Sequence, residues 1–478
     1  MKLTYLRFGT TALVWLFGTV VVSGQDLTNL SALSLNDLSA FKNPGSSWTV
    51  AGSVTANLNS ANELTLVKGP GILTNSPGKK GHGNDLFTNA VHGDMILELD
   101  YLMAKGSNSG IYLQGNYEIQ LLDSWTATNP LSSDNGGIYE RWDDSKPEGQ
   151  KGFGGYAPRQ NASKAPGLWQ HLKIAFQAPQ FDASGNKTAN ARILSAELNG
   201  VLIHDNVELF GPTRGAADKE KALGALRFQG DHGAVAFKNI KITALPKELR
   251  NGGQRGGGGA DPIYIDAPVN TMIRSFVDIS PGTRVVHAIS VGSPQKVHYS
   301  YDLDKGLLVY GWRGDFVDAT PMWDGRGNGT SRPRGARTAF TATLQPALAR
   351  LETAQAAWPL DTTGTGFKPR GYVMDNEDRP EFKYNLHGLQ VSDAIKALEN
   401  GEGLSREISL DKPAANIYLL LASGTDIQEL GKGIYLIDGQ SWYLKFSGPQ
   451  DKPLIREADG KKELIIQLRG KLNYSILF

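Results

Sequence analysis

The residues with the clearest chemical content lie between Asn108 and Trp125, where the sequence reads NSGIYLQGNYEIQLLDSW. Within it, Glu118, Gln120 and Asp123 follow one another at spacings of two and three residues. Polar groups in a row along one strand of a sugar-sized groove suit glycosidic chemistry, because one carboxyl group can move a proton while another stabilises or orients the substrate. The same pattern also fits the solvated outer face of an ordinary sheet, so both interpretations stay open at this point.

These side chains need a hairpin to present them. Apolar and polar residues alternate on both sides of Gly115, which predicts two antiparallel strands with one apolar and one polar face. A two-residue turn would pair Leu113 with Glu118 and mix the faces. A three-residue loop at residues 114–116 pairs Tyr112 with Glu118 and keeps the faces separate, so we expect the longer loop.

Asp123 fits this hairpin less easily. Strict alternation from Glu118 places Asp123 on the apolar face. A β-bulge at residues 121–122 would return it to the polar face, beside Glu118 and Gln120. Under that condition Asp123 is a third catalytic candidate, with an orienting role.

A histidine supplies the second acid/base candidate. His232 lies in the segment QGDHG, which begins at Gln229 and immediately precedes an expected strand. An imidazole with a pKa near 6.5 can give or take a proton at neutral pH. A histidine in a loop can instead only pack against a strand or cap it. The catalytic interpretation therefore requires that the fold bring His232 close to Glu118.

Further polar and aromatic residues are candidates for binding a sugar. The irregular stretch at residues 124–169 is rich in aromatic side chains, and an aromatic face can stack on the C–H groups of a sugar ring. Tyr139 and Trp142 are the preferred stacking candidates. The full set of expected substrate contacts is Asn108, Tyr112, Gln120, Trp125, Tyr139 and Trp142.

No metal ligands and no cofactor are assigned. Glu140, Asp143 and Asp144 could hold a cation together with Glu118, but a site for a hard metal needs oxygens that converge, and the sequence does not show convergence.

The rest of the chain predicts an all-β protein. Period-two alternation with intervening turn signals favours a two-sheet sandwich in the first half and a second, mostly β domain after it. One short helix is expected at residues 390–399. The expected strands cover residues 94–101, 171–176, 193–198, 234–242, 285–291, 296–301, 307–312, 417–422, 433–437, 442–446 and 463–468.

Composition limits the class of protein. Lys and Arg number 49 against 48 Asp and Glu, so a broadly basic nucleic-acid binder and an acidic disordered chain are both excluded. There is no cysteine, which excludes disulfides, thiolate metal sites and a cysteine nucleophile. With 56 glycines and few methionines, the 478 residues favour strands and turns.

Two segments divide the chain. Residues 1–24 combine a basic start with an uncharged apolar run and small residues, which predicts a cleavable secretory signal peptide and a secreted or periplasmic protein. An uncleaved anchor is the alternative. The stretch RNGGQRGGGGA at residues 250–260 is typical of a flexible linker. We therefore expect one domain at 26–249 and a β-rich accessory domain at 261–478, with no membrane span in the mature form.

The strand YEIQLLD resembles the E-x-D-x-x-E strand of laminarinase-type glycoside hydrolases, with Gln120 and Asp123 in place of the middle Asp and the last Glu. A closer resemblance, to the 3-keto-disaccharide hydrolase domain family, covers nearly the whole first domain, and its motifs occur in family order. The matching segments are DLSAFKNPGSSWTV from Asp37, HGDMILELDYLM from His92, NSGIYLQGNYEIQLLDSW from Asn108, GGIY from Gly136, PGLWQHLKI from Pro166, ELNGVLIHDNVEL from Glu197 and LRFQGDHGAVAFKNIKI from Leu226.

This second resemblance implies a concanavalin-like jelly-roll sandwich and cleavage of glycosides whose glucose ring is oxidised at C3. A ketone at C3 acidifies the C2 proton, so a base can form an enolate, the C1 oxygen can leave, and water can add. We therefore expect an exported enzyme that binds an oxidised glycoside, with Glu118 and His232 as acid and base. The alternatives are a lectin-like binding protein without turnover and an ordinary β-glucan hydrolase.

Overall fold

The computed structural model describes residues 32–78, 83–217, 219–250, 261–323, 325–341, 343–448 and 452–478. The signal peptide expected at residues 1–24 and the glycine-rich stretch at 251–260 lie outside the described residues. Nearly all regular structure is β; the helical pieces described are α1 (Lys247–Arg250) and the 3₁₀ turn η2 (Thr320–Met322). Within the described ranges, no helix has both the length and the apolar character needed to cross a membrane.

The N-terminal half is a sandwich of two antiparallel sheets. One sheet has the order β1 (Phe41–Lys42), β4 (Leu86–His92), β15 (Gly224–Phe228), β6 (Asn108–Leu113), β7 (Tyr117–Leu122). The other has the order β14 (Val201–Leu209), β13 (Ala191–Leu198), β10 (Gln170–Gln177), β5 (Met95–Met103), β16 (Val235–Ala244), β3 (Leu64–Asn75), β2 (Trp48–Ala56). Two short ribbons pair β8 (Arg141–Trp142) with β9 (Gly152–Phe153), and β11 (Gln180–Phe181) with β12 (Lys187–Ala189).

Alternation explains why these strands form and what they bury. In β5 every second residue from Met95 is buried, and the next two strands of the sheet, β10 and β13, largely repeat the pattern. The four strands expected at residues 94–101, 171–176, 193–198 and 234–242 all form, within a few residues of the expected bounds. Side chains from both sheets meet in one core, where Phe228 of β15 packs against Phe237 of β16. Each such side chain stabilises the fold by about 1.5–3 kcal/mol.

The C-terminal half is built from four further antiparallel sheets. A three-stranded sheet has the order β17 (Tyr264–Ile265), β22 (Val317–Asp318), β23 (Arg332–Pro333), and a five-stranded sheet β18 (Thr271–Ser280), β19 (Thr283–Gly292), β20 (Val297–Asp302), β21 (Leu307–Arg313), β24 (Ala336–Ala339). A four-stranded sheet has the order β25 (Leu348–Arg350), β30 (Ile417–Gly424), β35 (Lys461–Gln467), β34 (Leu454–Ala458). The largest runs β26 (Lys368–Met374), β27 (Pro380–Leu386), β28 (Leu389–Ala397), β29 (Gly403–Leu410), β36 (Lys471–Leu477), β33 (Trp442–Lys445), β32 (Ile434–Ile437), β31 (Ile427–Gly431).

The helix predicted at residues 390–399 is wrong, because this segment is strand β28. Its buried positions alternate, but one of them is Asp393 between Val391 and Ile395. A charged residue at an inward position hides the period of two in the sequence. The fold tolerates it because Arg406 on the neighbouring strand β29 binds both carboxylate oxygens.

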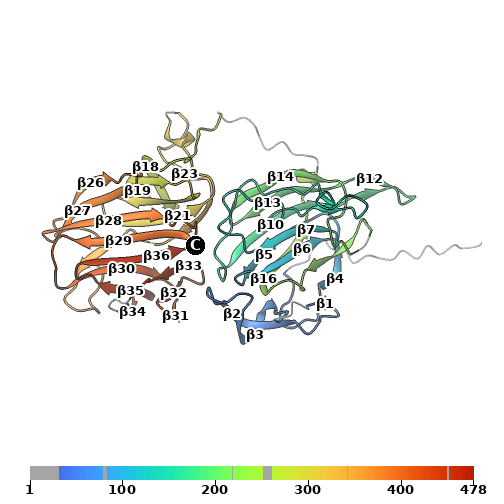
Figure 1. Cartoon of the computed structure of the whole chain (residues 1–478), viewed down its shortest axis with the longest axis horizontal. Coiled ribbons are helices and arrows are strands. Elements are labelled where there is room, and N and C mark those ends of the chain that lie inside the picture. The colour runs from blue at the N-terminus through green and yellow to red at the C-terminus, as the bar shows by residue number, and fades with distance from the viewer. Residues whose placement is uncertain are drawn as a thin grey trace, which may run out of the picture.

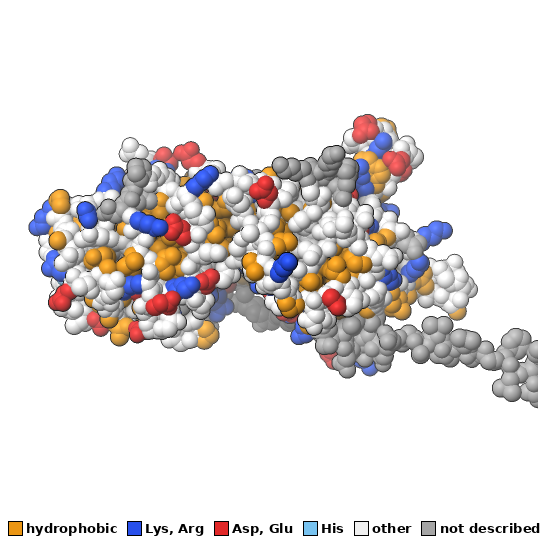
Figure 2. Space-filling view, turned by 90° about the horizontal axis from the view of Figure 1, so that it is seen from below, with side chains coloured by type: hydrophobic (Ala, Val, Ile, Leu, Met, Phe, Trp, Pro, Cys, Tyr) orange, Lys and Arg blue, Asp and Glu red, His pale blue; other side chains and the backbone are white. Residues whose placement is uncertain are grey.

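The two halves lie side by side and share a core (Figure 1). Trp125 and Leu168 from the first half pack with Tyr443 and Leu477 from the second, and the C-terminus lies between the lobes. Hydrogen bonds cross the same junction: the Tyr443 hydroxyl donates to the Pro166 carbonyl oxygen over 2.9 Å, and Gln440 Nε2 donates to the carbonyl of Val54 over 2.7 Å. On the face in Figure 2, basic and acidic side chains are interspersed, in keeping with the small net charge.

Candidate active site

Three neighbouring strands form the floor of the candidate site. The order β15-β6-β7 places Arg227 opposite Tyr112, and Tyr112 opposite Glu118. The register confirms the predicted three-residue loop, because pairing resumes with Leu113 opposite Tyr117. Gln114 and Gly115 take positive φ angles of 54° and 73° to close this loop. Polar side chains of three strands thereby share one face.

These side chains line a cavity of about 320 Å³. Its walls come from the hairpin, from the segment at 214–215, and from the segment that follows β15. The lining residues are Asn108, Tyr112, Glu118, Gln120, Tyr139, Arg214, Gly215, Arg227, Gln229, Asp231 and His232.

Glu118 is the buried acid of this cavity. Its residue is only 2% exposed, and its side chain lies across Gly110, where a Cβ atom would overlap the carboxylate. Burial raises the pKa of Glu118 to about 7, while the Tyr112 hydroxyl and the charge of Arg227 oppose the rise. Asp231 adds repulsion in the same direction as burial. A carboxyl group with this pKa exchanges protons readily at neutral pH.

His232 lies at the mouth of the same cavity and is exposed. Its Nδ1 is 2.5 Å from the Asp231 carboxylate. When Nδ1 carries the proton for that contact, Nε2 is left as the basic atom of the ring. Glu118 and His232, far apart in the sequence, therefore line one cavity, and the condition set by the sequence is met.

Two arginines, which sequence reasoning missed, bring positive charge to the site. Arg227 forms an ion pair with Asp85 at 2.5 Å, donates to the carbonyl of Gly215, and stacks over the Tyr112 ring at 4.1 Å. Arg214 lies over the ring of Trp142 at 3.7 Å. Arg227 belongs to the segment LRFQGDHG, whose alternation toward the polar face was a usable signal, whereas Arg214 lies in an irregular loop.

Three of the predicted substrate contacts are oriented by their neighbours. Gln120 Nε2 donates to Asn108 Oδ1 over 2.8 Å, which fixes both amides along the floor. Tyr139 reaches the cavity because its N–H donates to the carbonyl of Glu118 over 3.1 Å, outside the hairpin edge. Together with Tyr112, these residues offer hydroxyl and amide groups to a polyhydroxylated ligand.

Asp123 does not join them. Pairing between β6 and β7 continues without a bulge to Leu122, so Asp123 follows the strand and is not a lining residue of the cavity. Its carboxylate accepts the N–H of Gly106 over 2.7 Å. Burial raises the pKa of Asp123, and the charge of Glu402 from the C-terminal half adds to the rise. The bulge expected at residues 121–122 is wrong because the hairpin register needs no extra residue there.

Two of the predicted stacking residues also lie elsewhere. Trp125 is buried at the junction between the halves, where the guanidinium of Arg313 lies 5.3 Å from its ring. Trp142 is outside the cavity lining, but it carries Arg214, which is inside. The indole of Trp142 therefore reaches the site only through that arginine.

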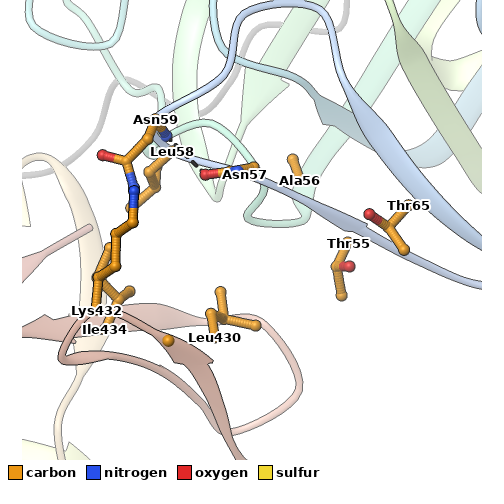
Figure 3. Close-up of a pocket in the computed structure, with 10 residues that line it drawn as sticks. Thr55, Ala56, Asn57, Leu58, Asn59, Thr65, Leu430, Lys432 and Ile434 are labelled. Atoms are coloured by element: carbon orange, nitrogen blue, oxygen red, sulfur yellow. Dashed lines mark hydrogen bonds between the residues drawn. The ribbon is translucent and has the colours of Figure 1, made fainter.

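A second cavity, of about 230 Å³, lies between the two halves (Figure 3). Its walls are residues 55–59 and Thr65 on one side and residues 430–432 and Ile434 on the other, and among these described lining residues Lys432 is the one titratable side chain. It therefore offers no acid/base pair. Across the described ranges, no group of three or more His, Asp or Glu side chains is placed to hold a metal ion.

Comparison with known families agrees with this geometry. Residues 35–243 match the family model described as a 3-keto-alpha-glucoside-1,2-lyase-like domain, and the match contains every residue lining the cavity. The N-terminal half of the chain is thus similar to that domain family. The C-terminal half matches no family model, and a comparison with curated proteins found no match.

Solved structures from Parabacteroides distasonis, each described as a "putative glycosyl hydrolase", are similar to part of this chain. One is 24% identical, covers 45% of this chain and 84% of its own, and has a TM-score of 0.32. Another is 18% identical, with 45% and 100% covered and a TM-score of 0.29.

Proposed function

We propose that the N-terminal half cleaves glucosides that carry a ketone at C3. The observation that carries the proposal is the meeting of Glu118 and His232 in one cavity, with a pKa near 7 for the buried carboxyl group. The family match supports the substrate class, and its description as a lyase agrees with elimination as the first chemical step.

The proposed reaction starts at the C2–H bond, because the neighbouring ketone makes the C2 proton more acidic. A base removes this proton, and the electron pair forms an enolate on the C3 oxygen. The enolate then collapses as the C1–O bond breaks, and the leaving oxygen receives a proton from an acid. The sugar remains as an unsaturated ketone, to which water adds at C1.

The side chains divide these tasks by position. His232, whose Nδ1 faces Asp231, has Nε2 free to accept the C2 proton. Glu118, partly protonated at neutral pH, donates to the leaving oxygen. The amide of Gln120 and the guanidinium of Arg227 supply N–H donors for the enolate oxygen, where charge develops.

The laminarinase-type alternative loses support from the geometry. Double displacement needs two carboxylates on either side of the scissile bond. Here the middle position of the strand is the amide Gln120, already bound to Asn108, and Asp123 lies outside the cavity. A second carboxylate of the cavity, Asp231, is held against His232.

The deciding experiment incubates the purified protein with a 3-keto-glucoside and measures release of the aglycone. We expect turnover by the wild type and its loss in Glu118→Gln and His232→Ala. Binding without release would favour the lectin-like alternative, and release from unoxidised glucan would favour an ordinary glucanase. Turnover that survives both substitutions would overturn the site assignment.

We further propose that the protein is exported and that residues 1–24 are its signal peptide. Residues 261–478 are proposed to form an accessory carbohydrate-binding or docking module. The N-terminal pattern supports the first part. Sequencing the N-terminus of protein recovered outside the cytoplasm tests it, and an intact Met1 would contradict it.

A further inference from the structure

Arg214 brings an uncompensated positive charge to the mouth of the cavity. It is exposed, it lines the cavity, and it forms no ion pair among the described residues. Its guanidinium instead rests on the indole of Trp142 at 3.7 Å. A cation over an indole face is attracted to the ring, but it keeps its charge and its outward N–H donors for a ligand.

The second arginine that lines the cavity is paired with a carboxylate. Arg227 is held by Asp85 at 2.5 Å, and Asp231 faces His232 at the same distance. Burial favours the neutral form of Glu118. Arg214 is therefore the arginine of the cavity whose positive charge is not paired with a carboxylate among the described residues.

The position of Arg214 is built into the fold. Its N–H donates to the carbonyl of Glu140 over 2.8 Å, and its own carbonyl accepts the Tyr112 hydroxyl over 3.3 Å. The indole beneath it is fixed in turn, because Trp142 Nε1 donates to Asp144 Oδ1 over 2.9 Å. The guanidinium is thus held on the ring of a β8 residue while it lines the cavity.

We propose that Arg214 forms a subsite for a carboxylate on the substituent attached at C1, so that the preferred substrates are 3-keto-glucosides with an acidic aglycone. The inference rests on the proposed function, which places C1, C2 and C3 of the sugar between Glu118 and His232. Glu118 protonates the oxygen that leaves C1, and the Tyr112 hydroxyl, which interacts with Glu118, donates to the carbonyl of Arg214, so a group leaving C1 lies beside the segment that carries Arg214. A planar guanidinium can bind a carboxylate through two parallel N–H···O bonds, which favours an anionic substituent over a neutral one.

The experiment uses two 3-keto-glucosides of phenols matched in leaving-group acidity, one with a carboxymethyl group and the other with the neutral carboxamidomethyl group. We expect the wild type to show about a five- to tenfold higher kcat/KM for the charged substrate, and the preference to shrink as salt is added. Arg214→Gln should abolish the preference and leave the neutral substrate within about twofold of wild type. Arg214→Lys should retain part of it.

Arg141→Gln is the matched control, since Arg141 lies over Phe153 in the same ribbon and outside the cavity lining. It should keep the preference intact. Equal losses on both substrates in Arg214→Gln would overturn the inference and assign Arg214 to the reacting ring instead, and turnover without a charge preference would overturn the inference alone.

Absence of turnover with either substrate would overturn the proposed function. In that case, calorimetric measurement of the binding of the same two glucosides tests the Arg214 subsite. Tighter binding of the charged one, lost in Arg214→Gln, supports the subsite, and equal affinities refute it.

Discussion

Two buried carboxyl groups, one in each half of the chain, lie in opposite environments. Asp393 on β28 is fully buried, and its oxygens accept Nε of Arg406 over 2.9 Å, Nη2 of Arg406 over 2.6 Å and the Tyr301 hydroxyl over 2.9 Å. Glu118 on β7 is equally hidden by its sheet, but no arginine or lysine lies within ion-pair distance of it among the described residues, and it faces a cavity.

The difference shows that the charge pairing of a buried acidic side chain decides whether it stabilises the fold or is available for proton transfer. Full pairing satisfies the Asp393 charge, so that side chain contributes to the fold and has no capacity left for a ligand. Without such pairing, the charged form of Glu118 is costly, so its pKa rises into the range where proton transfer is useful. Removing either acid should therefore produce effects of different kinds.

The largest effect is expected for Glu118→Gln on turnover of a 3-keto-glucoside. Loss of a general acid or base lowers rates by about 10²–10⁴-fold. Stability at pH 8 should stay equal or rise, because the amide avoids the cost of a buried charge. Paired kinetics and urea unfolding check both. A Glu118→Gln variant that keeps its activity but loses stability would contradict this expectation, because that is the result expected for loss of Asp393.

Asp393→Ala should act on stability alone. It leaves the guanidinium of Arg406 buried without its counterion, which costs about 3–5 kcal/mol of unfolding free energy. Urea unfolding measures the loss. The double variant Asp393→Leu, Arg406→Met removes both charges and should recover most of the stability; a double variant as unstable as the single one would show that the charges themselves are needed.

The pH dependence of stability should separate Glu118 from ordinary carboxylates. Its folded pKa of about 7 lies above the unfolded value of 4.5, so the native state holds a proton that the unfolded chain has lost between those two pH values. Stability therefore falls as pH rises through this window, by on the order of 3 kcal/mol in total. The difference in unfolding free energy between wild type and Glu118→Gln, measured at pH 4.5 and pH 8, isolates this contribution. A pH-independent difference would contradict it.

The smallest effect is expected for Gly110→Ala. The new methyl group would overlap Glu118 Oε1 and displace the carboxylate. We expect about a tenfold loss of kcat/KM, since a small misplacement of a reacting group is costly. Gly470→Ala, where nothing lies within 4 Å of the added atom and φ is not in the left-handed region, serves as a control for the general effect of an added methyl group. An unchanged rate in Gly110→Ala would mean that the position of Glu118 is not critical.

Much of the site could be predicted because it is local. The alternation on either side of Gly115 confines the hairpin to one register, so the pairing of Tyr112 with Glu118 and the shared face of Gln120 and Asn108 follow from neighbouring residues. The failures are also explained by particular residues. Asp123 comes after the strand ends, and Asp393 hides the alternation of β28.

The amino-acid sequence by itself determined many of the strands, the hairpin loop and the resemblance of the N-terminal half to a known domain family, because a period of two and the order of motifs are properties of adjacent residues. Only the tertiary structure decided which distant groups meet. It brought His232, Arg227 and Arg214 to Glu118, and it turned Trp125 toward the second half. Sheet order and the packing of one half on the other depend on contacts across long stretches of chain, and no local pattern encodes those contacts.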